Sequence, residues 1–368
     1  ATDIDMSGYY FTQGVTHTFA DGTTLPAGGY ILLTMPTANG DVDYNVYDPD
    51  GDGFHESGAA VIDWTSGGQS NGGEDIEIVY DVPGVDGNGD GDFDDLGVDN
   101  NGAVIAQLWH CGGFRKLGMQ PNPEVPGYTA SGLVKPGKKV AHEMTTDDIK
   151  ETIDAYASDA KICQDLGFDG VEIHGAHGYL IDNFFWGETN IREDLYGGSI
   201  EKRSQFVSDI VKAIRENVDD EFIVGLRFSQ WKQHDFDAKL AQTPDDLKKV
   251  LLPPVEAGLD YLHSSMRRFW ESEFDSSEEN LAYWTKKISN IPTVGVGSVG
   301  LDSDFIDMTA PANPTSIDRA IEDISTGKYD LIAVGRALLS DYEWVLKMKE
   351  GRLSDIIPYT KEALLKLY

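Results

Sequence analysis

Two histidines and a tyrosine lie close together in the sequence, in a segment that runs from Gly167 to Leu180. His174 and His177 are three positions apart, and Tyr179 follows two positions later. An imidazole N–H can hold a carbonyl oxygen or a developing oxyanion, and a phenol can deliver a proton to a reacting group. Two histidines at this spacing can also bind zinc, although the remaining ligands cannot be identified in the sequence. These residue types indicate an acid and oxyanion site, with a metal site as the alternative.

The elements that must position these side chains are strands and helices that alternate from Ala103 onward. Gly170–Ile173 is predicted to be a short buried strand that ends at the first histidine. From Asp147 to Leu166 the apolar residues recur on one stripe and stop at a glycine, which predicts a helix. Further strand-like runs occupy residues 103–109, 222–228, 261–263, 293–296 and 330–334. The alternation predicts an α/β barrel or a doubly wound sheet, and barrel enzymes carry their sites at the carboxyl ends of the strands.

A series of motifs surrounds the two histidines and continues through the second part of the chain. It comprises Gln107–His110, Asp182–Trp186, Asn190–Ser199, Arg203 with Phe206, Val224–Ser229, Thr293–Ser298 and Asp330–Leu339. In this order, over residues 103–368, the series resembles the old yellow enzymes, which are FMN-dependent (β/α)8 TIM-barrel reductases, and the related dienoyl-CoA reductases. The resemblance implies an NADH:flavin oxidoreductase. Such an ene-reductase passes a hydride from NADH or NADPH through the flavin to the C=C bond of an activated, enone-type alkene.

The resemblance assigns six residues to the FMN site. Gln107 would hydrogen-bond the flavin ring, and Arg227 would place a fixed positive charge against it. The phosphate would lie between the loops after the last two strands, where backbone N–H groups and an arginine can donate to it. The residues that match this phosphate site are Gly297, Ser298, Gly335 and Arg336.

The same resemblance assigns three residues to the alkene. His174 and His177 would bind its electron-withdrawing group, and Tyr179 would protonate its α-carbon. Four other conspicuous residues of this part of the chain are expected to line the pocket, anchor a loop or pack in the core. They are Arg267, Arg268, Trp109 and Trp186.

The family barrel has eight strands, whereas only strands three to eight can be identified in this sequence. The flavin contacts of the first two strands are therefore missing, and an open barrel exposes two sheet edges. Three arrangements remain open: the N-terminal segment covers the gap, a second copy covers it in a homo-oligomer, or the enzyme half is compromised. In the third case the chain would be a binding or surface module. Dienoyl-CoA reduction and amine oxidation are further alternatives on the same site.

Residues 1–102 differ in character from the rest, because they contain no Lys or Arg and the first basic residue is Arg115. Short alternating runs with Gly, Pro, Asn and Asp between them predict an all-β, immunoglobulin-like sandwich. The strand-like runs occupy residues 8–12, 29–34, 61–64 and 75–81. Four motifs resemble those of lamin-tail domains: Asp5–Gly8, Phe19–Leu25, Gly28–Tyr30 and Gly67–Ile76. We therefore expect a lamin-tail-like module over 1–102 and the barrel domain over 103–368.

Two Asp-rich loops lie in this first segment, Asp48–Asp52 and Asp86–Asp92. Oxygen ligands at alternate positions around a Gly turn suit Ca²⁺. Ala59 and Gly97, however, stand where an EF-hand loop needs its bidentate Glu. Solvated acidic turns are the favoured interpretation, and calcium binding is the alternative.

Composition excludes several classes of protein. The 368 residues carry a formal charge of −34, which disfavours nucleic acid and anionic membranes as partners. No apolar run reaches the roughly 18 residues of a membrane helix, and we expect no signal peptide at the start of the sequence. Two cysteines cannot supply a four-thiolate iron–sulfur cluster. The resemblance to the flavoenzymes implies a cytoplasmic protein, whereas lamin-tail-like modules are often attached to exported bacterial proteins.

Overall fold

The computed structural model describes residues 4–5, 24–25, 103–120, 122–275, 277–304 and 311–365. The predicted sandwich and the two Asp-rich loops lie outside these residues, apart from two short strands. These are β1 (Ile4–Asp5) and β2 (Thr24–Leu25), which pair antiparallel. The described residues from Ala103 onward, except Lys116–Pro126, form one compact unit, which contains the barrel.

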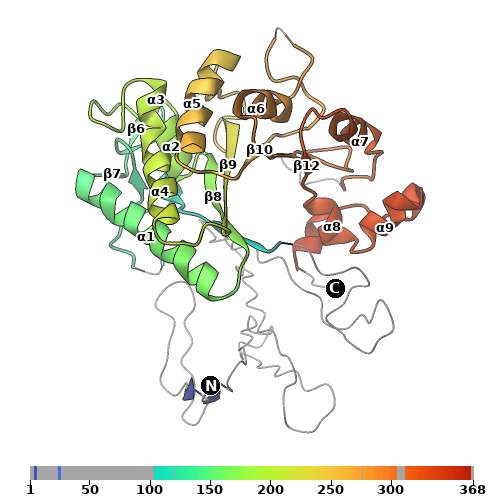
Figure 1. Ribbon diagram of the computed structural model, residues 1–368, viewed down its shortest axis with the longest axis horizontal. Coiled ribbons are helices and arrows are strands. Elements are labelled where there is room, and N and C mark those ends of the chain that lie inside the picture. Colours follow the sequence, from blue (N-terminus) through green and yellow to red (C-terminus); the bar gives the residue numbers. More distant parts are fainter. Residues whose placement is uncertain are drawn as a thin grey trace. The chain divides into compact units, whose positions relative to one another are not determined.

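Six strands of this unit form one parallel sheet (Figure 1). Their order in the sheet is their order in the chain, from β3 to β8, β9, β10, β11 and β12, and every neighbouring pair is parallel. Their bounds are β3 (Ile105–Leu108), β8 (Gly170–His177), β9 (Ile223–Lys232), β10 (Tyr261–Ser265), β11 (Thr293–Val296) and β12 (Leu331–Ile332). The predicted α/β architecture of the barrel type is confirmed. In the described part of the chain β3 and β12 are the two edges of the sheet.

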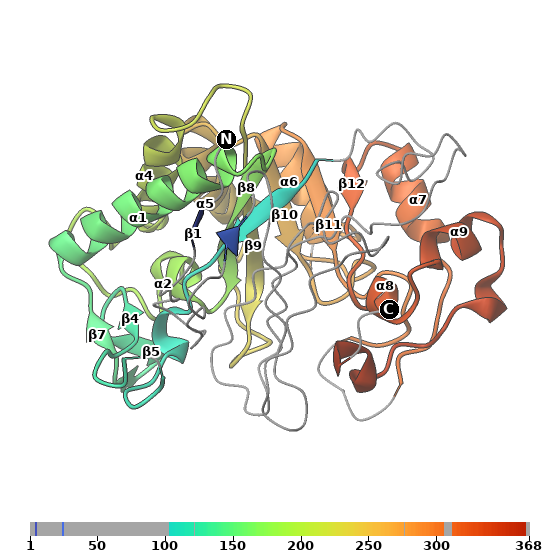
Figure 2. The ribbon, with the colours of Figure 1, turned by 90° about the horizontal axis from the view of Figure 1, so that it is seen from below.

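Helices connect consecutive strands and lie beside one another around the sheet (Figures 1 and 2). The crossovers contain α1 (Thr146–Asp165), α2 (Leu180–Phe185), α3 (Ile200–Arg203), α4 (Gln205–Arg215), α5 (Pro244–Glu256), α6 (Leu281–Ser289) and α7 (Asp318–Ser325). Two helices follow the last strand, α8 (Arg336–Ser340) and α9 (Trp344–Lys349). Shorter elements are η1 (Gly112–Phe114), β4 (Tyr128–Thr129), β5 (Leu133–Lys135), β6 (Lys138–Lys139), β7 (His142–Glu143), η2 (Leu353–Asp355) and η3 (Lys361–Leu365).

The first crossover helix illustrates how the sequence specifies its own ends. Thr145 and Asp148 form a capping box at the start of α1, so that each side chain accepts a hydrogen bond from the other's backbone N–H. The helix buries the predicted stripe, including Ile149 and Tyr156, and ends one residue before the predicted Leu166. No helix of the described residues is long and apolar enough to cross a membrane.

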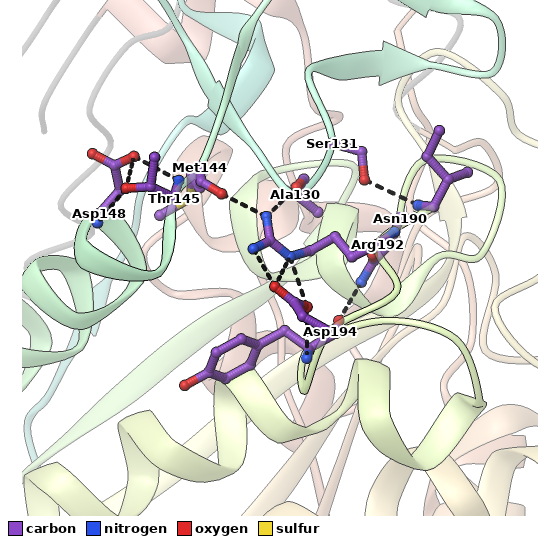
Figure 3. Close-up of polar contacts among 10 residues, drawn as sticks. Ala130, Ser131, Met144, Thr145, Asp148, Asn190, Arg192 and Asp194 are labelled. Carbon is purple, nitrogen blue, oxygen red and sulfur yellow. Dashed lines mark hydrogen bonds and ion pairs between the residues drawn. The ribbon is translucent and has the colours of Figure 1, made fainter.

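Arg192 joins three segments of the chain that are far apart in the sequence (Figure 3). Its Nη1 donates to the carbonyl oxygens of Ala130, at 2.7 Å, and Met144, at 2.5 Å. Its Nε and Nη2 donate to the carboxylate of Asp194. The Arg192 side chain is only 8% exposed. Arg192 therefore ties the segments of Ala130 and Met144 to its own segment, beside the barrel. This arginine of the Asn190–Ser199 motif thus has a structural role.

We expect the substitution Arg192→Lys to lower the free energy of unfolding by about 1.5–3 kcal/mol, because an ammonium group cannot reproduce a planar fork of donors. Urea denaturation of both proteins measures the difference. Arg352→Lys is the matched control, since the Arg352 side chain is 41% exposed and pairs with acidic side chains at the surface. Equal free energies of unfolding for the two variants would contradict the structural role of Arg192.

Candidate functional site

A cavity of about 320 Å³ opens at the carboxyl ends of the strands. It is lined by side chains and backbone from the ends of β8, β9, β10 and β11 and from the segment after β12. Six of the nine predicted site residues line it: His177, Arg227, Gly297, Ser298, Gly335 and Arg336. The structure thus brings together residues that are up to 159 positions apart, as expected for side chains at the same edge of a parallel sheet.

Backbone and arginine donors gather at one end of this cavity. Arg336 Nη2 lies 3.3 Å from Ser298 Oγ, and Ser298 itself has a left-handed backbone, with φ 51°. A Cβ atom at Gly297 would lie 2.7 Å from the carbonyl oxygen of Met266, so the loop can pass β10 only as glycine. A Cβ atom at Gly335 would meet no heavy atom within 4 Å, so the backbone there borders open space. This arrangement can accommodate an anion such as a phosphate.

The two histidines and the tyrosine lie side by side. The ring of His174 is 5.0 Å from that of His177 and 5.4 Å from that of Tyr179, centroid to centroid. His177 ends β8 in a left-handed conformation, with φ 65°, and its backbone N–H donates to Ser229 Oγ. Tyr179 follows as the residue that precedes α2. The end of β8 and the turn after it therefore bring three functional groups together, although of the three only His177 lines the cavity.

Both imidazoles are neutral at neutral pH. Burial, and then the positive charge of Arg227, lowers the pKa of His174 to about 3. The same two causes hold the pKa of His177 well below its ordinary value of 6.5. A neutral imidazole has one N–H donor and one acceptor nitrogen, so each histidine can donate a hydrogen bond to a ligand without carrying a charge.

The phenol of Tyr179 is held by polar and aromatic contacts. Gln233 Nε2 donates to its oxygen at 2.7 Å. The rings of Trp109 and Phe114 each lie 4.8 Å from the tyrosine ring, and the Trp109 contact is edge-on. Trp186 is buried beside the ammonium group of Lys232. The expected packing role of the two tryptophans fits these positions.

Glu172 is a functional candidate that the sequence analysis missed. Its buried carboxylate accepts hydrogen bonds from Gln107 Nε2 at 2.6 Å, from the Tyr261 hydroxyl at 2.9 Å, and from His263 Nδ1 at 2.9 Å. Gln107 therefore faces Glu172 and does not line the cavity. The signal in the sequence was the two-residue spacing of Glu172 and His174, which places both side chains on one face of the strand.

Glu172 is ionised in the folded protein. Burial alone would raise the pKa of its carboxyl group, but His263, Arg227 and Gln107 outweigh burial and lower the pKa to about 2. A buried carboxylate is tolerated only where partners of this kind compensate for lost hydration. The carboxylate is thus a buried negative charge that interacts with Arg227, and Arg227 lines the cavity.

Two buried polar atoms at or beside the cavity have no partner in the described part of the chain and are available to a ligand. Within the described residues, Arg227 Nε and His174 Nδ1 are buried and have no hydrogen-bond partner. Arg227 Nη2 donates to Ser265 Oγ at 3.3 Å, so only part of its guanidinium is engaged. Together with the anion end of the cavity, these groups fit FMN, which presents a phosphate and hydrogen-bond acceptors on its ring. The described residues contain no cluster of three or more His, Cys, Asp or Glu that could hold a metal ion.

Two ion-pair groups flank the site. Arg267 and Arg268 both pair with the buried carboxylate of Asp304, at 2.9 and 2.8 Å, and Arg267 also lines the cavity. Arg267 thus lines the cavity, and both arginines anchor the segment that carries Asp304, which fits the roles expected of them. Lys232 and Asp182 form a fully buried pair at 2.7 Å that joins the end of β9 to α2. The sequence analysis missed this pair because its members are 50 positions apart.

Comparison with known proteins identifies the family. A model of the NADH:flavin oxidoreductase / NADH oxidase family matches residues 97–355, and the chain belongs to this family. The family is one of enzymes that use FMN and NAD(P)H, in agreement with the predicted enzyme class and cofactors.

Individual relatives match only part of their own length. An NADH oxidase of Thermoanaerobacter brockii is 35% identical over 222 residues, which covers 58% of this chain and 31% of the relative. A probable NADH-dependent flavin oxidoreductase of Bacillus subtilis is 31% identical over 265 residues, which covers 69% of this chain and 64% of the relative. The alignments therefore span only 31% and 64% of the length of these two relatives.

A solved structure supports the same fold. The structure of morphinone reductase in complex with tetrahydroNAD aligns with a TM-score of 0.57 and 21% sequence identity. The alignment covers 72% of this chain and 69% of morphinone reductase.

We expect Glu172→Gln to lower the free energy of unfolding at neutral pH by about 3 kcal/mol, because it breaks a buried charged network. The sign of the pH dependence follows from the lowered pKa. Glu172 stabilises the fold fully above its ordinary pKa of 4.5 and loses this contribution as the pH falls towards about 2. The difference between parent and variant should therefore shrink with acidification.

Urea denaturation at several pH values measures this difference. Glu151→Gln on the exposed face of α1 is the matched control and should leave the free energy of unfolding nearly unchanged. A destabilisation by Glu172→Gln that stays constant down to low pH would contradict the ionised state of Glu172.

Proposed function

We propose that the chain is an FMN-dependent oxidoreductase that transfers a hydride from NAD(P)H to the C=C bond of an activated, enone-type alkene. FMN, when bound, supplies the redox chemistry that links the nicotinamide to the alkene. The observation that carries the proposal is that six of the predicted site residues line one cavity. Relatives named cinnamate reductase, putative 12-oxophytodienoate reductase and NADH:acrylate oxidoreductase support the substrate class.

In this proposal the anion end of the cavity holds the FMN phosphate. Arg336 supplies a charged donor, and the Ser298 hydroxyl lies within its reach. The glycines Gly297 and Gly335 let backbone N–H groups approach the phosphate without a side chain in the way. Arg227, on the wall of the cavity, places positive charge beside the flavin ring and stabilises its anionic form.

Gln107 has a less direct place in the proposal. The resemblance to the old yellow enzymes assigns it to the flavin ring, while its Nε2 donates to Glu172. This hydrogen bond fixes the orientation of the Gln107 amide, and Glu172 in turn balances the positive charge of Arg227. Gln107 would thus hydrogen-bond the flavin ring in an orientation that its bond to Glu172 fixes.

The two histidines and Tyr179 act on the alkene. His174 and His177 are neutral donors, and they can polarise a carbonyl oxygen and stabilise the negative charge that develops on it. This polarisation makes the β-carbon a hydride acceptor. Tyr179 would deliver the proton to the α-carbon, because a placed phenol can act as a general acid. Gln233 holds the phenol in place for this step.

We expect Tyr179→Phe to slow alkene reduction about 10²–10⁴-fold, which is the usual contribution of a placed proton donor. Reduction of the flavin by the nicotinamide needs no proton to carbon, so its rate should be almost unchanged. Anaerobic stopped-flow absorbance of the flavin follows the two half-reactions separately.

Tyr283→Phe on α6 is the control for the loss of a hydroxyl group outside the site. Among the polar groups of the described residues, the Tyr283 phenol contacts only the side chain of Lys287. Equal slowing of both half-reactions by Tyr179→Phe would show a displaced flavin. An unchanged rate of alkene reduction would show that another group supplies the proton.

A further inference from the structure

Ser265 lies between the guanidinium group of Arg227 and the imidazole of His177. Its Oγ is 2.8 Å from Nε2 of His177 and 3.3 Å from Nη2 of Arg227. The residue is the last of β10, is only 2% exposed, and lines the cavity together with both partners. Neither of these two contacts was predicted, because each of the three residues comes from a different strand.

The direction of the hydrogen bonds follows from the chemistry of the three groups. An arginine side chain only donates, so Ser265 Oγ accepts from Arg227. The serine proton is then left for His177 Nε2, which must accept it. In the reverse arrangement His177 Nε2–H would donate, and the buried serine proton would have no acceptor among the described residues. A buried hydroxyl without a partner costs roughly 1–3 kcal/mol, which favours the first arrangement.

Neighbouring groups fix the orientation of the His177 ring. Trp231 stacks on it, with ring centroids 4.3 Å apart and planes inclined by 24°. The indole N–H of Trp231 donates to the backbone oxygen of Ser265 at 3.0 Å, which ties the stacking residue to the same serine. The ring of His177 therefore has little freedom to exchange the positions of its two nitrogens.

We propose that Ser265 is a positioning residue that holds His177 in the tautomer with the proton on Nδ1. Because Nε2 is occupied by the serine, a ligand can meet only Nδ1, and Nδ1 is then a donor. The site accordingly selects ligands that present an acceptor oxygen, such as a carbonyl, nitro or phenolate oxygen. The other tautomer would present a lone pair and repel them. The statement on ligands rests on the proposed function, whereas the statement on the tautomer does not.

Nuclear magnetic resonance of the full chain tests the tautomer without any need for activity. Long-range ¹H–¹⁵N correlation of ¹⁵N-histidine-labelled protein distinguishes protonated from unprotonated ring nitrogens, and the spectrum of His177→Gln assigns the signals among the eight histidines. We expect the proton of His177 on Nδ1 in the parent. In Ser265→Ala the ring should shift towards the Nε2–H tautomer, and Ser265→Thr, which keeps the hydroxyl, should restore the parent pattern.

Ser264→Ala is the matched control, because this neighbouring serine of β10 donates to Thr285 of α6 and does not contact His177. Its spectrum should equal that of the parent. A parent His177 protonated on Nε2, or an unchanged His177 signal in Ser265→Ala, would overturn the proposal. The parent measurement decides the question even if Ser265→Ala does not fold.

Titration of FMN-loaded protein with a simple phenol tests the consequence for ligands. Compared per bound flavin, Ser265→Ala should bind the phenolate about 10-fold more weakly than the parent, the effect of one lost hydrogen bond. Unchanged phenol affinity together with a shifted tautomer would overturn the role of Ser265 in ligand selection. Protein that holds no FMN would contradict the proposed function and leave the tautomer result intact.

Discussion

The arrangement of the barrel interior depends on one buried carboxylate. Glu172 on β8 accepts hydrogen bonds from β3 on one side and from β10 on the other, and β9 lies between β8 and β10. The bond to β10 can cross β9 because Gly225 has no side chain there, and a Cβ atom at that position would overlap the ring of Tyr261. A buried ionised carboxylate must be hydrogen-bonded. The contacts of Glu172 therefore constrain the register of β3, β8, β9 and β10.

The same charge prepares the site above it. Strand side chains alternate, so the positions two residues beyond Glu172 and His263 on the same faces are His174 and Ser265. Arg227 lies opposite His174 in the register and also acts on the pKa of Glu172. The carboxylate thus compensates the arginine, which can then direct part of its guanidinium to a ligand. Burial, together with this positive charge, lowers the pKa of both histidines and keeps them neutral. The balance of charge between Glu172 and Arg227 therefore affects the groups of the site, which lie two residues further along the strands.

The sequence predicted the elements well where a local pattern specifies them. The strand 293–296 was predicted with its observed bounds, and the helix 147–166 within one residue at each end. The strand predicted for 170–173 continues to His177, because His174, Gly175 and His177 pair with β9 across an irregularity in the register, although their pattern is not typical of a strand. The cavity-lining residues could be predicted because parallel strands bring their carboxyl ends to one edge.

The contacts between strands could not be predicted in this way. Glu172 with His263, Ser265 with His177, and Lys232 with Asp182 all depend on the register between strands that are far apart in the sequence. The resemblance to the flavin reductases placed Gln107 at the flavin, but it could not show that the amide also holds Glu172. The segment 1–102 stays a prediction, since it lies almost entirely outside the described residues.

We propose above all that the six-stranded sheet of the described residues retains FMN in its cavity, and the flavin content of the purified chain tests this most directly. Absorbance of the bound oxidised flavin, followed by titration with added FMN, should give one FMN per chain. Arg336→Ala should bind FMN roughly 10–100-fold more weakly, because it loses a charge-assisted contact with the phosphate. Arg319→Ala on the exposed face of α7 should bind it like the parent. Colourless protein that takes up no added FMN, or equal FMN affinity in Arg336→Ala and the parent, would contradict the account.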